Sequence, residues 1–523
     1  MSEHSELKKF FSFKYNFYKE RTSSKDNILM VDRQRIDSTI MNAMLALAVN
    51  KKYKKNVIIL SDLNKDNLII KFYKHLGFKK YLSGMNYFQC IKHPYLFIQS
   101  LIISILAVIN IFNNGFLWFI NNYKIDNIPF GDLIYDTNIR FHHRYINPKI
   151  DYRFIKLLIL STFRILLILK YFKEYNIKKI VVGNESYAFN PGVALRISIF
   201  KGIKNYYPGR TSDTEFEIAT DDKQKLFLGR DNIRHKLIQK EFKKFRKSSK
   251  EVNNFYLSRK NTMNKKYFWT ANNFRNANYQ SKEGLNFIKK ISKIKKKKIL
   301  YASHAFSDAA HQKGLIYSFQ DFYNQLVSTL SYVFKNDDEN IWIFRAHPSS
   351  KIYNEGSVFI DLIKKFKKEN IYICPKNVPI KELYELCDTV VTGSGTAGLE
   401  FICEGKQAIL AGSAAYSTRS VTPYYAKNQK EYFKYLTNIN YLKKPNNKQR
   451  DMAKKLIFFY ESGKFIIKKI PTDLLKKDKI FYSFFLSFFG LGLNLKDYLN
   501  LTHSVLKKDI HKSKAFNEIV KLV

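Results

Sequence analysis

Cysteine is scarce in this sequence. Its 523 residues include only four cysteines, which are scattered without a pairing pattern: Cys90, Cys374, Cys387 and Cys403. Their spacing argues against a disulfide framework and matches no metal-binding motif, as is typical of proteins in a reducing cytosol. The first residues are polar and lack the apolar core of a signal peptide. We therefore expect a cytoplasmic protein with no metal and no other cofactor.

Acidic residues are also few. The chain has 44 Asp and Glu against 90 Lys and Arg, which leaves a net charge of +46. This excess predicts an anionic partner, such as a nucleotide, an anionic membrane surface, an acidic glycan or a nucleic acid. It also fits a genome whose bias enriches lysine, asparagine and isoleucine throughout. Because no nucleic-acid-binding module is recognisable, we expect no nucleic acid partner.

The length and the apolar content predict more than one domain. A chain of 523 residues is too long for a single core, and a hydrophobic content of 45% excludes general disorder. Short apolar strands alternate with helical patterns, which indicates doubly wound α/β units. We predict two Rossmann-like α/β domains facing across a cleft at 25–210 and 298–425, a basic interdomain region at 211–297, and a C-terminal helical extension at 426–523.

One strand, turn and helix stand out as a candidate anion site. Thr389–Thr392 has the pattern of a buried strand, and Ala397–Cys403 that of a helix. The turn between them has small residues only, namely Gly393, Ser394, Gly395 and Thr396. Free N–H groups at a helix N-terminus favour a phosphate, which glycines allow to approach closely. An ordinary helix N-cap explains the same residues equally well.

A second strand ends in a histidine and a proline. Ile341–Phe344 is followed by Arg345, His347 and Pro348. Pro348 restricts His347 to an extended backbone at the carboxyl end of the strand, where open parallel sheets bind ligands. An imidazole there can donate to a phosphate, a ribose or a base. A structural histidine is the alternative.

Three further groups of polar residues follow predicted strands or separate apolar segments. His304 and Asp308 follow the strand Ile299–Ala302 and suit acid, base or donor-positioning roles. Asp136 and Arg140 suit an acceptor-side site, or else an Asp–Arg ion pair on a loop. Glu185 is either a general base or a structural carboxylate.

Tyr95–Phe112 is the most apolar run, and its length is compatible with a transmembrane helix. Polar residues such as Gln99 and Ser104 interrupt it. Phe481–Leu495 is apolar but short and contains two glycines. We expect these segments to be buried or to lie on a membrane surface, so that the protein is peripheral at the inner face of the cell membrane. A membrane-spanning helix at Tyr95–Phe112 is the alternative.

The sequence resembles a known family at three places. These are Arg345 to Pro348, the turn from Thr392 to Glu400, and Ala411 to Ser417. They are similar to the capsule polysaccharide biosynthesis proteins, a group that includes bacterial Kdo transferases of the GT-B glycosyltransferase fold. The resemblance covers roughly 298–425. The His-Pro and Ser/Thr pairing is also similar to bacterial sialyltransferases of that fold.

The resemblance implies a glycosyltransferase that uses a nucleotide-activated sugar, such as a CMP-linked sugar acid, and a glycan or lipid-linked glycan acceptor. It also implies nucleotide or phosphate contacts for Arg345, His347, Pro348, Gly393–Thr396 and Glu400. A CDP-glycerol-type phosphotransferase is the nearest enzymatic alternative. A non-catalytic capsule assembly or export factor is the alternative of another class.

Overall fold

The computed structural model describes residues 25–523 with gaps. The residues not described are 33–35, 64–67, 85–86, 144, 147, 183–186, 209–214, 221–246, 263–280, 312–315, 317, 352, 377, 415, 419, 462–466 and 472–513. Two features singled out from the sequence, Glu185 and Phe481–Leu495, lie outside the described residues.

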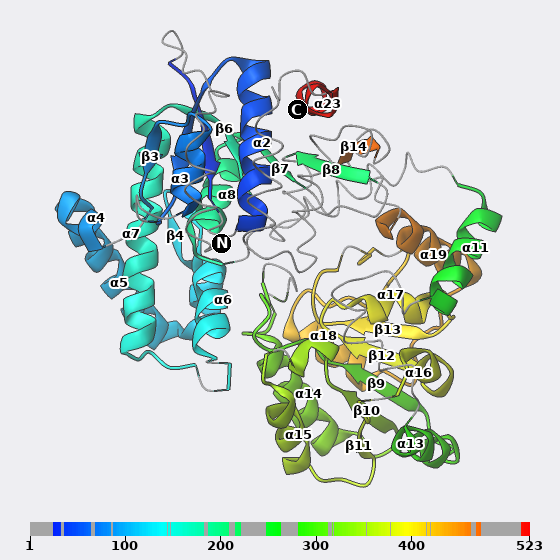
Figure 1. The fold of residues 1–523 in the computed structure, drawn as a ribbon. Helices are drawn as coiled ribbons and strands as arrows, with labels where there is room; N and C mark the ends of the chain where they lie inside the picture. The colour runs from blue at the N-terminus through cyan, green and yellow to red at the C-terminus, as the bar shows by residue number, and fades with distance from the viewer. Residues whose placement is uncertain are drawn as a thin grey trace, which may run out of the picture.

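The first domain is built on a seven-stranded sheet with the order β14-β8-β7-β6-β1-β2-β3 (Figure 1). The strands from β7 to β3 are parallel, whereas β8 and β14 are antiparallel to their neighbours. The four apolar residues of β1 after Asn27 are fully buried, as expected of a central parallel strand. The strands are β1 (Asn27–Val31), β2 (Asn56–Leu60), β3 (Lys80–Leu82), β6 (Ile177–Val181), β7 (Lys204–Pro208), β8 (Glu215–Thr220) and β14 (Ile467–Pro471).

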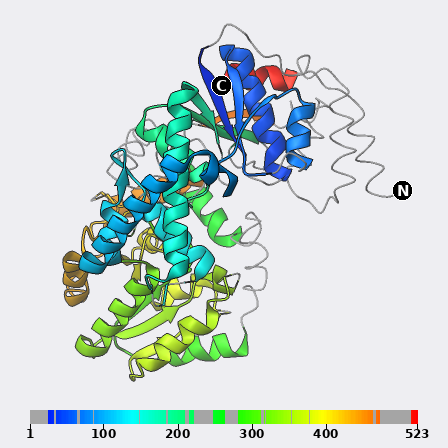
Figure 2. The same cartoon turned by 90° about the vertical axis from the view of Figure 1, so that its left-hand side faces the viewer.

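Seven helices and a small two-stranded ribbon from residues 36–200 of the described chain belong to this domain. The long helices α5 and α7 lie side by side along one side of the molecule (Figures 1 and 2). The helices are α2 (Ile36–Tyr53), α3 (Leu68–His75), α4 (Tyr87–Lys92), α5 (Pro94–Asn122), α6 (Gly131–His142), α7 (Tyr152–Glu174) and α8 (Asn190–Phe200), and the ribbon pairs β4 (Lys124–Ile125) with β5 (Ile128–Pro129).

The second domain is built on a five-stranded, entirely parallel sheet with the order β11-β10-β9-β12-β13. The strands are β9 (Lys298–Ala302), β10 (Ile341–Arg345), β11 (Ile371–Ile373), β12 (Thr389–Thr392) and β13 (Gln407–Leu410). The helices are α11 (Ser249–Thr262), α13 (Lys282–Ser292), α14 (Phe322–Asn336), α15 (Gly356–Lys365), α16 (Ile380–Leu386), α17 (Thr396–Cys403), α18 (Gln429–Thr437) and α19 (Asn447–Glu461), with a short 3-10 helix η2 (Pro348–Lys351). Two Rossmann-like domains, as predicted, are therefore present.

The chain after residue 425 is not only the helical extension expected from the sequence. Helices α18 and α19 pack on the second domain, but β14 then pairs with β8 of the first sheet. The last helix, α23 (Lys514–Leu522), packs on α2, where Phe516 and Ile519 are buried and the Tyr53 hydroxyl donates to the Val523 carbonyl oxygen at 2.9 Å. The chain thus returns from the second domain to the first, where β14 pairs with the edge of β8.

The interdomain region predicted at 211–297 is divided between the two domains. Strand β8 extends the first sheet, whereas α11 packs against α19 and α13 against α16 in the second domain.

Candidate functional site

Three adjacent strands of the second domain end in the residues singled out from the sequence. Strand β9 lies between β10 and β12, and all three are parallel. Their carboxyl ends therefore meet at one edge of the sheet, the edge at which open α/β sheets bind ligands. His304 follows β9, Arg345 ends β10, His347 lies two residues after it, and the turn 393–396 follows β12. We call this edge the rim.

His304 occupies the middle of the rim. Its Nε2 accepts a hydrogen bond from the Ser394 backbone N–H at 3.2 Å. Its ring stacks on Phe322, with centroids 4.2 Å apart, and lies nearly parallel to His347, with centroids 6.1 Å apart. Burial lowers the pKa of His304 to about 3, with the charge of His347 acting in the same direction. The neutral ring therefore carries its proton on Nδ1, because Nε2 is an acceptor.

The glycines of the turn serve the approach of His304. A Cβ on Gly393 would lie 3.0 Å from His304 Cδ2 and 3.0 Å from Phe322 Cε1. A Cβ on Gly395 would lie 3.1 Å from Thr392 Oγ1 and 3.4 Å from His304 Nε2. From the sequence, these glycines were expected to allow a phosphate to approach the turn closely. In the structure, the His304 imidazole lies against the turn at both glycines.

His347 is also held in one tautomer. Pro348 begins η2, and the Ser349 backbone N–H donates to His347 Nδ1 at 3.2 Å. Burial lowers the pKa of His347, Asp308 opposes this effect, and Arg345 adds to it. The neutral ring therefore carries its proton on Nε2, which leaves that nitrogen as a donor.

Arg345 ends β10 with a buried donor that lacks an acceptor among the described residues. Its Nη1 is buried and makes no hydrogen bond to any residue that the structure describes. Leaving a buried charged donor unsatisfied is costly, and a phosphate or carboxylate oxygen would satisfy it. Arg345 therefore fits a role in binding an anion at the rim.

The helix that follows the turn presents its first residue to solvent. Thr396 is exposed and begins α17. The N-cap residue of that helix is Gly395, which has no side chain to accept from the first N–H groups. Tyr416 donates to the Gly395 carbonyl oxygen from the loop after β13, which fixes the turn from the other side. At the far end of α17, Gly405 has a φ of 76°, as expected of the residue after a helix C-cap.

Glu400 has structural partners. Its Oε1 accepts from Arg259 Nη2 at 2.8 Å, and its Oε2 accepts from the Tyr384 hydroxyl at 2.5 Å. The side chain is buried in the middle of α17 and ties that helix to α11 and α16. These contacts account for Glu400 without a nucleotide, so they do not support the contact expected from the sequence.

Asp136 joins the two domains. It lies on α6, not on a loop, and its Oδ1 is 2.7 Å from His311 Nδ1, while its Oδ2 accepts from the His311 backbone N–H at 3.1 Å. Both side chains are fully buried. Burial alone would lower the pKa of His311, but the Asp136 carboxylate raises it overall. The expectation that Asp136 contacts the glycan acceptor is therefore corrected. Asp136 forms an interdomain ion pair with His311, and its buried carboxylate is out of reach of a glycan.

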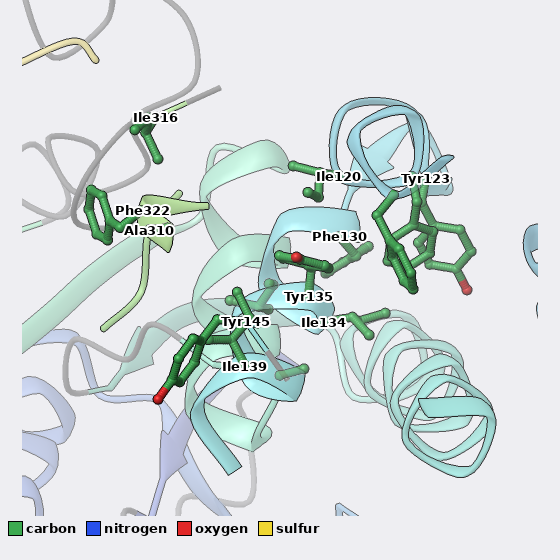
Figure 3. Close-up of a cluster of buried hydrophobic side chains, with 14 of the residues drawn as sticks. Ile120, Tyr123, Phe130, Ile134, Tyr135, Ile139, Tyr145, Ala310, Ile316 and Phe322 are labelled. Atoms are coloured by element: carbon green, nitrogen blue, oxygen red, sulfur yellow. The ribbon is translucent and has the colours of Figure 1, made fainter. Parts of the chain in front are cut away.

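A second interdomain contact lies beside the first. The Tyr135 hydroxyl donates to Asp321 Oδ2 at 2.8 Å, and Asp321 caps α14 by accepting from the Asn324 backbone N–H. Figure 3 shows Tyr135 and Tyr145 in the same apolar cluster as Ala310 and Phe322 of the second domain. The segment that carries His304 and Asp308 is therefore fastened to α6 of the first domain.

Arg140, unlike Asp136, lies toward the rim. Its guanidinium carbon is 4.1 Å from the centroid of the Tyr353 ring, which belongs to the loop after η2. Burial raises the pKa of Tyr187, the charge of Asp308 adds to this effect, and Arg140 opposes it. Tyr187 and Tyr353 were missed in the sequence because isolated tyrosines carry no motif. The chemistry of the rim thus extends onto the first domain.

Glu355 is a further residue that the sequence reasoning missed. It accepts from the Phe306 and Ser307 backbone N–H groups, each at 2.7 Å, and so shapes the segment between His304 and Asp308. Within the described ranges, no group of three or more His, Cys, Asp or Glu side chains is arranged to hold a metal ion.

The comparisons with known proteins support the resemblance seen in the sequence. Two Rossmann-like domains form the GT-B architecture that the resemblance implied. Residues 201–435 match the family model described as capsule polysaccharide biosynthesis protein, and this stretch contains every rim residue of the second domain. No curated protein matches the chain.

Several solved structures are similar to this chain at low identity. A glycosyltransferase from Rickettsia africae ESF-5 is 13% identical, with 95% of this chain and 99% of that chain covered and a TM-score of 0.22. KpsC of Thermosulfurimonas dismutans, a beta Kdo 2,4 transferase, is 10% identical, with 53% of this chain and 79% of that chain covered and a TM-score of 0.26. The UDP-GlcNAc 2-epimerase of Methanocaldococcus jannaschii is 12% identical over 84% and 99%, with a TM-score of 0.23. TM-scores of this size carry no functional argument.

Proposed function

We propose that this protein is a glycosyltransferase of bacterial surface polysaccharide biosynthesis that moves a sugar from a nucleotide-activated donor to a glycan acceptor. One observation carries the proposal. Arg345, His347, His304 and the turn 393–396 converge on the carboxyl ends of three adjacent parallel strands. These residues also lie inside the stretch that matches the capsule polysaccharide family model.

The donor phosphate is assigned to four groups of the rim. The buried Nη1 of Arg345 supplies a charge-assisted hydrogen bond, and the His347 Nε2–H supplies a neutral one. The hydroxyl of Thr396 and the N-terminus of α17 add further donors. Together they offset the negative charge that develops on the leaving nucleotide.

His304 and Asp308 take different catalytic roles. Because His304 is neutral with its proton on Nδ1, it acts as a hydrogen-bond donor and not as a base. Asp308 lies close enough to influence the pKa values of His304, His347 and Tyr187. In the transfer, the acceptor hydroxyl oxygen attacks the anomeric carbon, the bond to the phosphate oxygen breaks, and Asp308 receives the hydroxyl proton.

The donor we propose is a CMP-linked sugar acid such as Kdo, and the acceptor a glycan or lipid-linked glycan. The resemblance to Kdo transferases suggests this donor. Arg140 on α6, beside Tyr353, offers a second cation for a carboxylate or an acidic acceptor. Since arginine, histidine and helix N–H groups supply the donors, the mechanism needs no divalent metal for its charge balance.

The test is the variant His347→Ala together with a nucleotide screen. We expect CMP to raise the melting temperature of the wild type and to raise that of the variant by less, because the Nε2–H donor is lost while Arg345 remains. Transfer from the CMP-sugar should be abolished in a variant whose far-ultraviolet circular dichroism is unchanged.

The screen separates the alternatives. Stabilisation by CDP or UDP in place of CMP would indicate CDP-glycerol-type phosphotransfer or another nucleotide sugar. A wild type that binds no nucleotide at millimolar concentration would overturn the proposal and favour a non-catalytic capsule assembly or export factor.

A further inference from the structure

Helices α4 and α5 expose a continuous apolar face to solvent. Its nine large side chains are each half or more exposed, and all but the adjacent Ile105 and Leu106 are spaced three or four residues apart, as on one side of a helix. We call this face the α4–α5 stripe, made of Phe88, Ile91, Tyr95, Ile98, Ile102, Ile105, Leu106, Ile109 and Phe112.

The buried face of α5 is less apolar than its exposed face. Ser100, Ser104, Ala107 and Ile111 are the buried residues of this part of the helix, which packs on α7. An ordinary surface helix has the reverse arrangement, with polar residues outside. Exposed apolar patches of this extent on soluble proteins mark an interaction site.

By length and composition, α5 is the one helix among the described residues that qualifies as a membrane span, yet only 22% of its most apolar window is buried. Its second half belongs to the core of the first domain. Phe116 and Phe119 pack on Phe154 of α7, with ring centroids 5.2 and 5.9 Å apart. A spanning helix would have to pull these side chains out of the core.

The backbone separates the two halves of α5. Gly115 has a φ of 76° and interrupts the helical geometry between the stripe and the anchored end. The Tyr123 hydroxyl, just after the helix, lies 2.5 Å from the Thr162 hydroxyl of α7 and holds that end in place. The stripe is therefore exposed along the outside of the domain, on the side of the molecule that faces the viewer in Figure 2 and carries α5.

The charge around the stripe selects its partner. Residues 67–125 contain six lysines and no acidic residue. Exposed Lys92 lies beside Phe88 of the stripe, and at the other end Tyr152 is 72% exposed next to Arg153, at the start of α7. An aliphatic face with lysine at one end and arginine at the other complements anionic phospholipid headgroups. Two copies of the chain that met through this face would instead bring positive charges together.

We infer that the α4–α5 stripe docks the protein in the plane of an anionic phospholipid membrane. The aliphatic side chains enter the boundary between headgroups and acyl chains, and the lysines remain at the headgroups. Helix α6, which packs against α5, carries Arg140 toward the rim, so docking holds the candidate site one helix away from the lipid surface. This inference does not depend on the proposed transfer chemistry.

The test is sedimentation with phosphatidylcholine vesicles that contain or lack phosphatidylglycerol. We compare the wild type with Ile102→Asp/Ile105→Asp. The matched control is Leu257→Asp, an equally exposed leucine on α11 of the second domain. We expect the double variant to bind the anionic vesicles at least about tenfold more weakly, and the control to bind within about twofold of the wild type. Circular dichroism and melting temperature check that both variants fold.

A second measurement reports insertion directly. In a Cys90→Ser background, an environment-sensitive fluorophore on Ile98→Cys should shift its emission to shorter wavelength with anionic vesicles and be quenched by brominated acyl chains. Equal binding of the double variant and the wild type overturns the inference. So does a wild-type dimer that the double variant converts to a monomer without vesicle binding, or a wild type that only detergent extracts after an alkaline wash.

Discussion

The carboxyl ends of the strands are completed differently in the two domains. In the first domain, Asp32 follows β1 and is buried, and it accepts from the Ser61 hydroxyl at 3.0 Å and the Tyr73 hydroxyl at 2.9 Å. In the second domain, Arg345 ends β10 with a buried Nη1 that has no acceptor among the described residues. Asp32 is thus satisfied by neighbouring side chains, whereas Arg345 keeps a buried donor that we propose binds an external anion.

This difference shows what a strand-end polar residue means. Polar residues follow apolar strands in both domains, so the local pattern is the same. What separates a structural carboxylate from a binding cation is the set of side chains that arrive from elsewhere in the fold. Predictions on the two edges should therefore separate stability from ligand binding.

The largest effect is expected at Arg345. Arg345→Ala removes a charge-assisted hydrogen bond to the ligand, which contributes about 1.5–3 kcal/mol, or roughly 10- to 100-fold in affinity for CMP. The free energy of unfolding of the variant should not fall, because no described residue accepts a hydrogen bond from Arg345 Nη1. Isothermal titration and urea denaturation measure the two quantities. A loss of stability with unchanged CMP affinity would make Arg345 structural.

The opposite result is expected at Asp32. Asp32→Ala leaves the Ser61 and Tyr73 hydroxyls buried without this acceptor, which should cost about 2–3 kcal/mol in the free energy of unfolding. Asp126→Ala is the control, because Asp126 is 56% exposed and pairs with Lys201 on the surface. CMP affinity should be unchanged in both folded variants. If Asp32→Ala weakened CMP binding tenfold, the first edge would also be a ligand site.

A smaller effect is expected at Gly393. Gly393→Ala places a methyl group 3.0 Å from His304 and Phe322, so the rings must move, at a cost of about 1–2 kcal/mol. Gly356→Ala is the matched control in α15, where the new methyl group meets only Lys376 Nζ at 3.6 Å. We expect the control to be neutral or slightly stabilising. Equal melting temperatures of the two variants would contradict the close packing of His304.

Much of the fold was predictable from the sequence. The strands β9, β10 and β12 lie where short apolar runs bounded by polar residues predicted them, because a buried parallel strand is apolar on both faces. The turn after β12 and the His-Pro after β10 were likewise found from local composition. The strand β14 was missed, because Ile467–Pro471 becomes a strand only when β8 is beside it.

The apolar run in α5 was recognised from the sequence, but which of its faces is exposed was not. The sequence of Tyr95–Phe112 is equally compatible with a buried, a spanning and a surface helix. Only its packing on α7 shows that the small residues face inward and the large ones outward.

By itself, the sequence determined the two α/β domains and the residues that end their strands, since both depend on patterns only a few residues long. The tertiary structure decided the partners. Asp136 and His311 are 175 positions apart, and Ser394 and His304 are 90 positions apart. No local pattern encodes such pairs, because folding brings them together only when sheets and helices pack. Those pairs bury Asp136 between the domains and fix the tautomer of His304.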